Sequence, residues 1–121
     1  MEDFKDICAA IVDKYPLRCE VEEYFADQRI TKAIFRVMGV GEHLTWATIA
    51  VPTKQAGDPL VKRFIRAHIL AHYAFYGGDD LRDEAAILLK GVVRDARRNN
   101  SLHWLADRAE TLHAELTEQP V

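Results

Sequence analysis

The sequence predicts an α+β fold with the element order α-β-β-β-α-α-α: an N-terminal helix, a three-stranded antiparallel meander, a buried central helix and a C-terminal helical hairpin. Apolar residues recur every three or four positions towards both ends of the chain, which is typical of amphipathic helices. Between them, residues 17–26, 30–38 and 44–51 alternate apolar and polar side chains, as half-buried strands do. At 121 residues the chain is expected to form a single domain, 1–121, in which a 1–78 α-β-β-β-α unit precedes a helical hairpin at 79–118.

The first helix is predicted over residues 2–14, because Phe4 and Ile11 belong to one apolar stripe and Pro16 ends it. The chain has two cysteines, Cys8 and Cys19, and both fall on predicted core faces. We expect them to be small buried apolar residues in a reducing compartment. Their spacing leaves open whether they form a disulfide.

A three-residue turn at 27–29 sets the predicted register of the first hairpin. It pairs apolar side chains on the core face and mostly polar ones on the opposite face: Cys19 with Val37, Val21 with Phe35, Glu20 with Arg36, and Tyr24 with Lys32. A slip of one residue would bring Cys19 against Arg36, which rejects the alternative register.

A two-residue turn at Val40 and Gly41 sets the predicted register of the second hairpin. It places Leu44 and Trp46 on the core face, opposite Val37 and Phe35. The other face then also carries apolar residues: Tyr24, Ile34, Met38, Ala47, Ile49 and Val51. Two apolar faces both need cover. The first and central helices can cover one, and the C-terminal helices, a second copy or a partner must cover the other.

The central helix is predicted over residues 59–76 and organises the domain. Asp58 is suited to the N-cap and Pro59 to the first helical position, while Gly77 and Gly78 provide the C-terminal stop. The helix is apolar nearly all round, and residues 67–76 contain no formal charge. Such a helix is expected to be buried on several sides.

The C-terminal hairpin is predicted to join helices at residues 81–98 and 102–118. Asp79 or Asp80 is expected to cap the first of these helices, and Ser101 the second. The second helix has a narrow apolar seam that suits packing against the first. The last residues, 117–121, are expected to fray.

The net charge is −3, but the charge is segregated along the chain. Residues 27–78 hold seven Lys and Arg against three Asp and Glu, whereas both flanks are acidic. Lys62, Arg63 and Arg66 crowd the start of the central helix, where cations oppose the helix dipole. Two interpretations stay open: a solvated rim paired with nearby carboxylates, or a site for an anionic partner.

His68 and His72 lie four residues apart and project from one face of the central helix, a spacing that suits a metal. Ile69 occupies the position where the metalloprotease pattern has Glu, and the sequence places no third ligand beside them. No phosphate-binding Gly-rich loop or nucleophile elbow occurs. We therefore expect neither catalysis nor a cofactor, and we keep a metal-dependent enzyme using His68 and His72 as a third hypothesis.

The order helix, three strands, helix resembles the double-stranded RNA-binding domain, and the Lys62-Arg63-x-x-Arg66 pattern is similar to the basic helix start of that family. The resemblance covers about the first two-thirds of the chain. It implies nucleic-acid binding through the head of the helix at 59–76. In place of the family's Gly-Pro-x-His loop, this chain has residues 27–29, Asp-Gln-Arg.

The leading hypothesis is a small non-catalytic protein-binding module that regulates or inhibits a partner protein with an acidic surface, with a homodimer as an open alternative. A small inhibitor encoded by a phage or mobile element fits this profile. The chain begins MEDFKD and has no apolar run of membrane-spanning length, so we expect a cytoplasmic location without a membrane. Trp and Arg are enriched in interfaces, and the predicted partner-binding residues are Arg36, Lys62, Arg63, Arg66, Trp104 and Arg108.

Overall fold

A computed structural model describes residues 2–39, 44–76 and 79–118, and it confirms the predicted fold class and element order. The helices are α1 (Glu2–Lys14), α2 (Pro59–Phe75), α3 (Arg82–Ala96) and α4 (His103–Glu118), and the strands are β1 (Leu17–Ala26), β2 (Ile30–Gly39) and β3 (Leu44–Pro52). Short 3-10 turns precede α2, α3 and α4, at Thr53–Gln55, Asp79–Leu81 and Asn100–Leu102.

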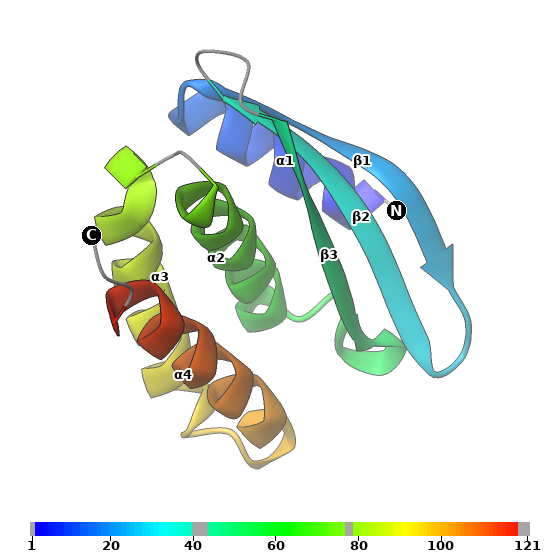
Figure 1. Cartoon of the computed structure of the whole chain (residues 1–121). Helices are drawn as coiled ribbons and strands as arrows, with labels where there is room; N and C mark the ends of the chain where they lie inside the picture. The colour runs from blue at the N-terminus through cyan, green and yellow to red at the C-terminus, as the bar shows by residue number, and fades with distance from the viewer. Residues whose placement is uncertain (1, 40–43, 77–78, 119–121) are drawn as a thin grey trace.

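The three strands form one antiparallel sheet in the order β1-β2-β3, and the helices lie to one side of it (Figure 1). Helix α1 packs on β1, and α2 packs beside α1 against β2 and β3. Helices α3 and α4 pack on α2 and on each other, forming a further layer beyond it. The C-terminal hairpin therefore does not supply the cover that the second face of the sheet was expected to need.

Helix α2 is the centre of the domain, as predicted. Nine of its 17 residues are buried: Val61, Phe64, Ile65, Ala67, Ile69, Leu70, Ala71, Tyr73 and Ala74. Asp58 caps its start, because the side-chain Oδ1 accepts a hydrogen bond of 2.8 Å from the backbone N–H of Leu60. The predicted glycine stop at residues 77 and 78 lies outside the described residues.

The first hairpin follows the predicted register from its open end as far as Val21, which pairs with Phe35. A β-bulge then separates Val21 from Glu23. Beyond it the prediction is wrong, because the extra residue exchanges the two faces of β1. Tyr24 pairs with Ala33 and packs edge-on against the ring of Phe4, with ring centroids 5.7 Å apart.

The register predicted for the second hairpin is wrong by one residue. Phe35 pairs with Ala47 rather than with Trp46, and Val37 pairs with Thr45 rather than with Leu44. Because side chains alternate along a strand, this slip moves the whole apolar set of β3 to the other face. The proposed turn at 40–41 lies outside the described residues. As a result Ala47, Ile49 and Val51 are buried under the helices, and Leu44 and Trp46 face outwards.

Two predicted helix caps are also wrong. Leu81 occupies the cap position of α3, since Asp79 and Asp80 form a 3-10 turn that places them before it. In front of α4, Asn99 rather than Ser101 is the capping residue. Its side-chain Oδ1 accepts from the backbone N–H of Ser101 at 3.0 Å, which opens a 3-10 turn ahead of the helix. The predicted fraying of residues 119–121 falls outside the described residues, while Thr117 and Glu118 belong to α4.

Candidate functional site

The face of the sheet that turns away from the helices carries apolar side chains from all three strands that no described element covers. We call it the outer sheet face. Its apolar members come from all three strands and are half-buried or exposed: Phe25, Ile30, Ile34, Met38, Leu44 and Trp46. Trp46 is 47% exposed and Phe25 is 55% exposed. An antiparallel sheet with one solvated face ordinarily presents polar residues there, so this face is suited to an interaction.

Three cations stand among these apolar side chains: Arg18 on β1, opposite Met38, and two on β2. Arg36 lies directly across from Trp46 on β3, and Lys32 lies across from Phe25 on β1. Both are exposed, and neither forms an ion pair or side-chain hydrogen bond within residues 2–39, 44–76 and 79–118. Of the predicted partner-binding residues, Arg36 is therefore an exposed cation without a partner in the described structure.

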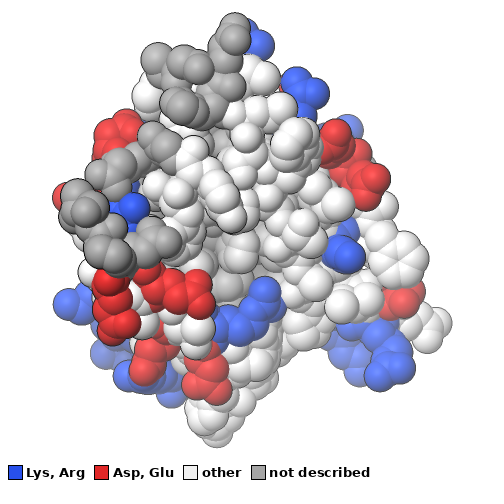
Figure 2. Space-filling view, in the orientation of Figure 1, with Lys and Arg blue, Asp and Glu red and all other residues white. Residues whose placement is uncertain are grey.

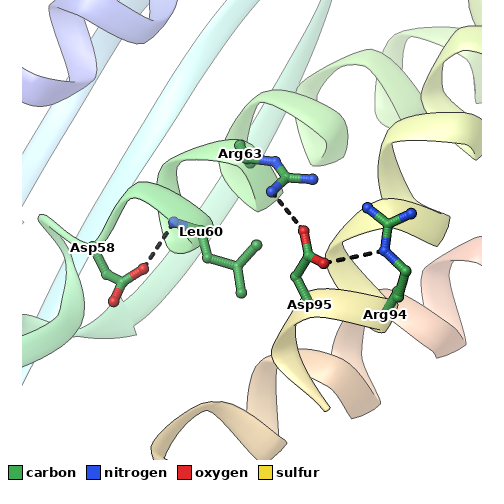
Figure 3. A network of polar contacts seen from close by, with 5 residues as sticks. All are labelled: Asp58, Leu60, Arg63, Arg94 and Asp95. Atoms are coloured by element: carbon green, nitrogen blue, oxygen red, sulfur yellow. Dashed lines mark hydrogen bonds and ion pairs between the residues drawn. The ribbon is translucent and has the colours of Figure 1, made fainter. Parts of the chain in front are cut away.

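The basic head of α2 is largely neutralised within the chain. Lys62 Nζ lies 3.0 Å from Asp3 Oδ1 of α1, and Arg63 Nη1 lies 2.9 Å from Asp95 Oδ2 of α3. Figure 3 shows Asp95 between Arg63 and Arg94, whose guanidinium groups lower the pKa of its carboxyl. Lys62 and Arg63 thus contact carboxylates from the acidic flanks of the sequence. This arrangement agrees with the first interpretation of the basic residues, a rim paired with nearby carboxylates.

Arg66, the third cation of the head, is only partly exposed, and its Nε is buried without a hydrogen-bond partner among the described residues. Its charge lies near Glu84 of α3 and helps to lower the pKa of that carboxyl, after the hydrogen bonds from Tyr15 and Lys14. The three basic side chains do not form one open cationic surface.

Trp104 and Arg108 join α4 to the end of the sheet. Trp104 Nε1 donates to Gln55 Oε1 at 2.8 Å, and Arg108 Nη1 donates to the backbone carbonyl of Ala50 at 2.8 Å. The guanidinium of Arg108 also lies over the rings of Trp104 and Phe64, 5.5 and 5.2 Å from their centroids. These residues make intramolecular contacts, the packing role that Trp residues commonly have.

A groove of about 680 Å³ runs between α2 and α4, where His68, His72 and Tyr76 face Leu112 and Glu115. Figure 2 shows an area without charged side chains over α2 and β3, with carboxylates gathered over α4. Burial, together with the smaller effects of the nearby His72 and Arg108, lowers the pKa of His68 to about 4.

The two histidine rings of this groove stack with centroids 6.4 Å apart. Burial lowers the pKa of His72, while a hydrogen bond to the backbone carbonyl of Trp46 opposes that shift. No group of three or more His, Cys, Asp and Glu side chains within the described ranges is arranged to hold a metal ion. His72 is instead engaged with the edge of β3, and Arg108 covers the same edge at Ala50.

Sequence reasoning missed two features. Leu44 and Trp46 were expected in the core, and the signal that could have corrected this is the apolar set Ala47, Ile49 and Val51, which forms an equally good face of β3. The contact between Cys8 and Cys19 has no local sequence signal, because it depends on how α1 packs on β1.

Comparison with known protein families, with curated protein sequences and with solved structures finds no significant match for this chain. The structure defines the fold class of the chain. It is an α+β domain in which the described helices cover one face of the sheet and leave the other face uncovered. No described helix has both the length and the apolar character needed to cross a membrane.

Proposed function

We propose that this chain is a non-catalytic protein-binding module that regulates or inhibits a partner by docking on it through the outer sheet face. One observation carries the proposal: an exposed apolar surface centred on Trp46 has beside it Arg36, which forms no ion pair with any described residue. Trp and Arg are the residue types most enriched at the energetic centres of protein interfaces. By binding, the chain would cover a surface of the partner and thereby regulate the partner.

Charge complementarity indicates the chemistry of the partner. The β2 and β3 part of the outer sheet face carries Lys32 and Arg36 and no acidic residue among those described. A partner surface with apolar side chains and one or two carboxylates would bury Trp46 and Leu44 and pair both cations. Buried or half-buried charges need such pairing to bind well.

The acidic strand β1 favours a protein over nucleic acid as the partner. Glu20 and Glu23 lie on the same outer face, opposite Arg36 and Ile34 respectively. These carboxylates alternate with Arg18, Lys32 and Arg36, so the face is not the uniformly cationic surface that binds a phosphate backbone, and the chain's net charge of −3 also disfavours nucleic acid. The basic head of α2 offers no alternative, because Lys62 and Arg63 are already paired.

We place the protein in the cytoplasm, because both of its cysteines, Cys8 and Cys19, are free thiols. A role as a small inhibitor encoded by a phage or mobile element is consistent with a single binding face on a chain of 121 residues.

The proposal is tested by photo-crosslinking in cells of the source organism, with benzoylphenylalanine introduced at one position at a time. Thr48 lies on the outer sheet face next to Trp46, and Ile87 is an exposed control on α3. We expect a crosslink to a different protein from position 48 and none from position 87. A crosslink from 48 to nucleic acid, or no crosslink at all, would overturn the proposal.

The same partner should depend on the chemistry of the face. Trp46→Ser and Arg36→Glu are expected to abolish its crosslink from position 48, whereas Lys90→Glu, the same charge change on exposed α3, should leave it intact. A crosslink from position 48 to a second copy of this chain would replace the proposal by the homodimer alternative. Light scattering of the purified chain would then give twice the mass of 13.8 kDa.

A further inference from the structure

The two cysteines, 11 positions apart in the sequence, are in contact. Cys8 of α1 and Cys19 of β1 have their Sγ atoms 3.4 Å apart, and the Cys19 thiol donates to the Cys8 sulfur. Both residues are free thiols and both are buried. A disulfide has an S–S length of about 2.05 Å, so the two sulfurs need to approach by only about 1.4 Å to bond.

A groove of about 720 Å³ reaches this thiol pair from the surface. Both sulfur-bearing residues line it, together with Lys5, Val12 and Glu20. Val12 is 45% exposed and lies one turn along α1 from the buried Cys8. Asp13 lines it too, so the groove combines an apolar wall with one cation and two carboxylates, which can pair with an amino and a carboxylate group of a small peptide.

The environment makes the two thiols unequal. The hydrogen bond from Cys19 lowers the pKa of the Cys8 thiol, against the opposing effects of burial and of the Glu20 carboxylate. The pKa of Cys19 is raised, because its thiol proton is held by Cys8 and because the residue is buried. The thiolate is the nucleophile in thiol–disulfide exchange, so Cys8 is the attacking sulfur and Cys19 the resolving one.

We propose that Cys8 and Cys19 form a redox-active dithiol that reacts with small disulfides of the glutathione class and closes into an α1–β1 disulfide. Cys8 releases its proton to water, its thiolate attacks one sulfur of oxidised glutathione, the S–S bond breaks, and one glutathione thiolate leaves and takes a proton from water. Cys19 then releases its proton to water, its thiolate attacks Cys8 Sγ, and the second glutathione leaves in the same way. Two protein thiols are oxidised to one disulfide, and one glutathione disulfide is reduced to two thiols.

The first test uses the unmodified full chain, reduced and then incubated with mixtures of reduced and oxidised glutathione at neutral pH. Intact mass and thiol count are followed with time. We expect both thiols to disappear together, with a mass loss of two hydrogens and only a transient adduct carrying one glutathione. Persistence of both thiols in oxidised glutathione alone would overturn the proposal, and so would accumulation of an adduct carrying two glutathiones.

Single variants assign the two roles. Cys19→Ser should trap a stable glutathione adduct on Cys8, located by peptide mapping, whereas Cys8→Ser should leave Cys19 at least about tenfold slower to react. Equal rates in the two variants would overturn the assignment. Glu20→Gln removes the carboxylate that raises the pKa of Cys8, so its initial reaction should be faster than that of the unmodified chain. An unchanged rate at neutral pH would contradict the electrostatic part of the argument.

Discussion

The guanidinium of Arg108 donates a hydrogen bond from Nη1 to the backbone carbonyl of Ala50 over 2.8 Å, and this contact ties α4 to the free edge of β3. Desolvation lowers the pKa of Arg108, and the flat face of its side chain rests on Phe64 and Trp104. One side chain thus joins α2, α4 and the sheet. It also occupies a backbone carbonyl at a strand edge that could otherwise pair with another chain.

Arg108→Ala is expected to destabilise the fold by about 2 kcal/mol, because a hydrogen bond to a charged group and its ring contacts are lost together. The free energy of unfolding is measured by urea denaturation. Arg98→Ala, an exposed arginine just beyond α3, is the control and should change it by less than about 0.5 kcal/mol. Equal stabilities of the two variants would show that the Ala50 contact contributes nothing measurable.

His68 makes stability depend on pH in a defined direction. Its pKa falls from 6.5 to about 4 on folding, so the unfolded chain binds more protons than the folded chain between these values. The stabilising effect of the neutral ring is complete above pH 6.5 and is lost as the pH falls towards 4. The loss is about 3 kcal/mol at most.

This loss of stability is measured by urea denaturation at several pH values from about 7 to about 4. That interval covers the pKa of His68 in the unfolded chain, 6.5, and in the folded chain, about 4. His68→Gln should have a shallower pH dependence than the unmodified chain, whereas His103→Gln, at the exposed start of α4, should keep the full slope. If His68→Gln and the unmodified chain show the same slope, burial of the neutral His68 ring does not govern acid stability.

Gly39 is required by the ring of Tyr73. A Cβ atom at position 39 would collide with the hydroxyl oxygen and Cζ of Tyr73, and Tyr73 is only 6% exposed. Gly39→Ala should therefore destabilise the fold by about 1–3 kcal/mol as the ring is displaced. Gly57→Ala is the matched control, since its Cβ would lie 3.8 Å from Asp3 Oδ2, an ordinary contact. Thermal unfolding compares them, and a stable Gly39→Ala variant would show that the ring can move at little cost.

Oxidation of the thiol pair is expected to stabilise the chain. A disulfide between Cys8 and Cys19 restricts the unfolded state, by about 3 kcal/mol for a loop of this size when the bond forms without strain. Urea denaturation with and without a reductant measures the difference, with Cys19→Ser as the control that reductant should not affect. An oxidised chain less stable than the reduced one would mean that closing the bond strains the packing of α1 on β1.

Much of the fold follows from local patterns. The bounds of all three strands, the cap at Asp58 and the burial of α2 were predictable, because alternation, capping chemistry and an uncharged helix are properties of neighbouring residues. The turn at 27–29 was predictable too. There the backbone N–H groups of Arg29 and Ile30 both donate to Asp27 Oδ1 at 2.8 Å.

The candidate site was only partly predictable, and the register of β3 is the reason. Residues 44–51 are apolar on both faces, so alternation alone cannot say which face is buried. The small Ala47 faces the helices, where α2 packs against β3, whereas the large indole of Trp46 lies outside. The bulge after Val21 was not predictable either, because one extra unpaired residue in a strand does not change the residue types from which a strand is predicted.

The sequence by itself determined the elements, their order and the central place of α2, because each depends on side chains close together in the chain. Only the tertiary structure decided which cations are free and which surface is open. Lys62 and Arg63 look like a basic site until helix packing brings Asp3 and Asp95 to them, while Arg36 stays unpaired within the described residues. A charge is neutralised, or a sheet face covered, by residues that are distant in the sequence. Only the packing of the helices on the sheet brings those residues together.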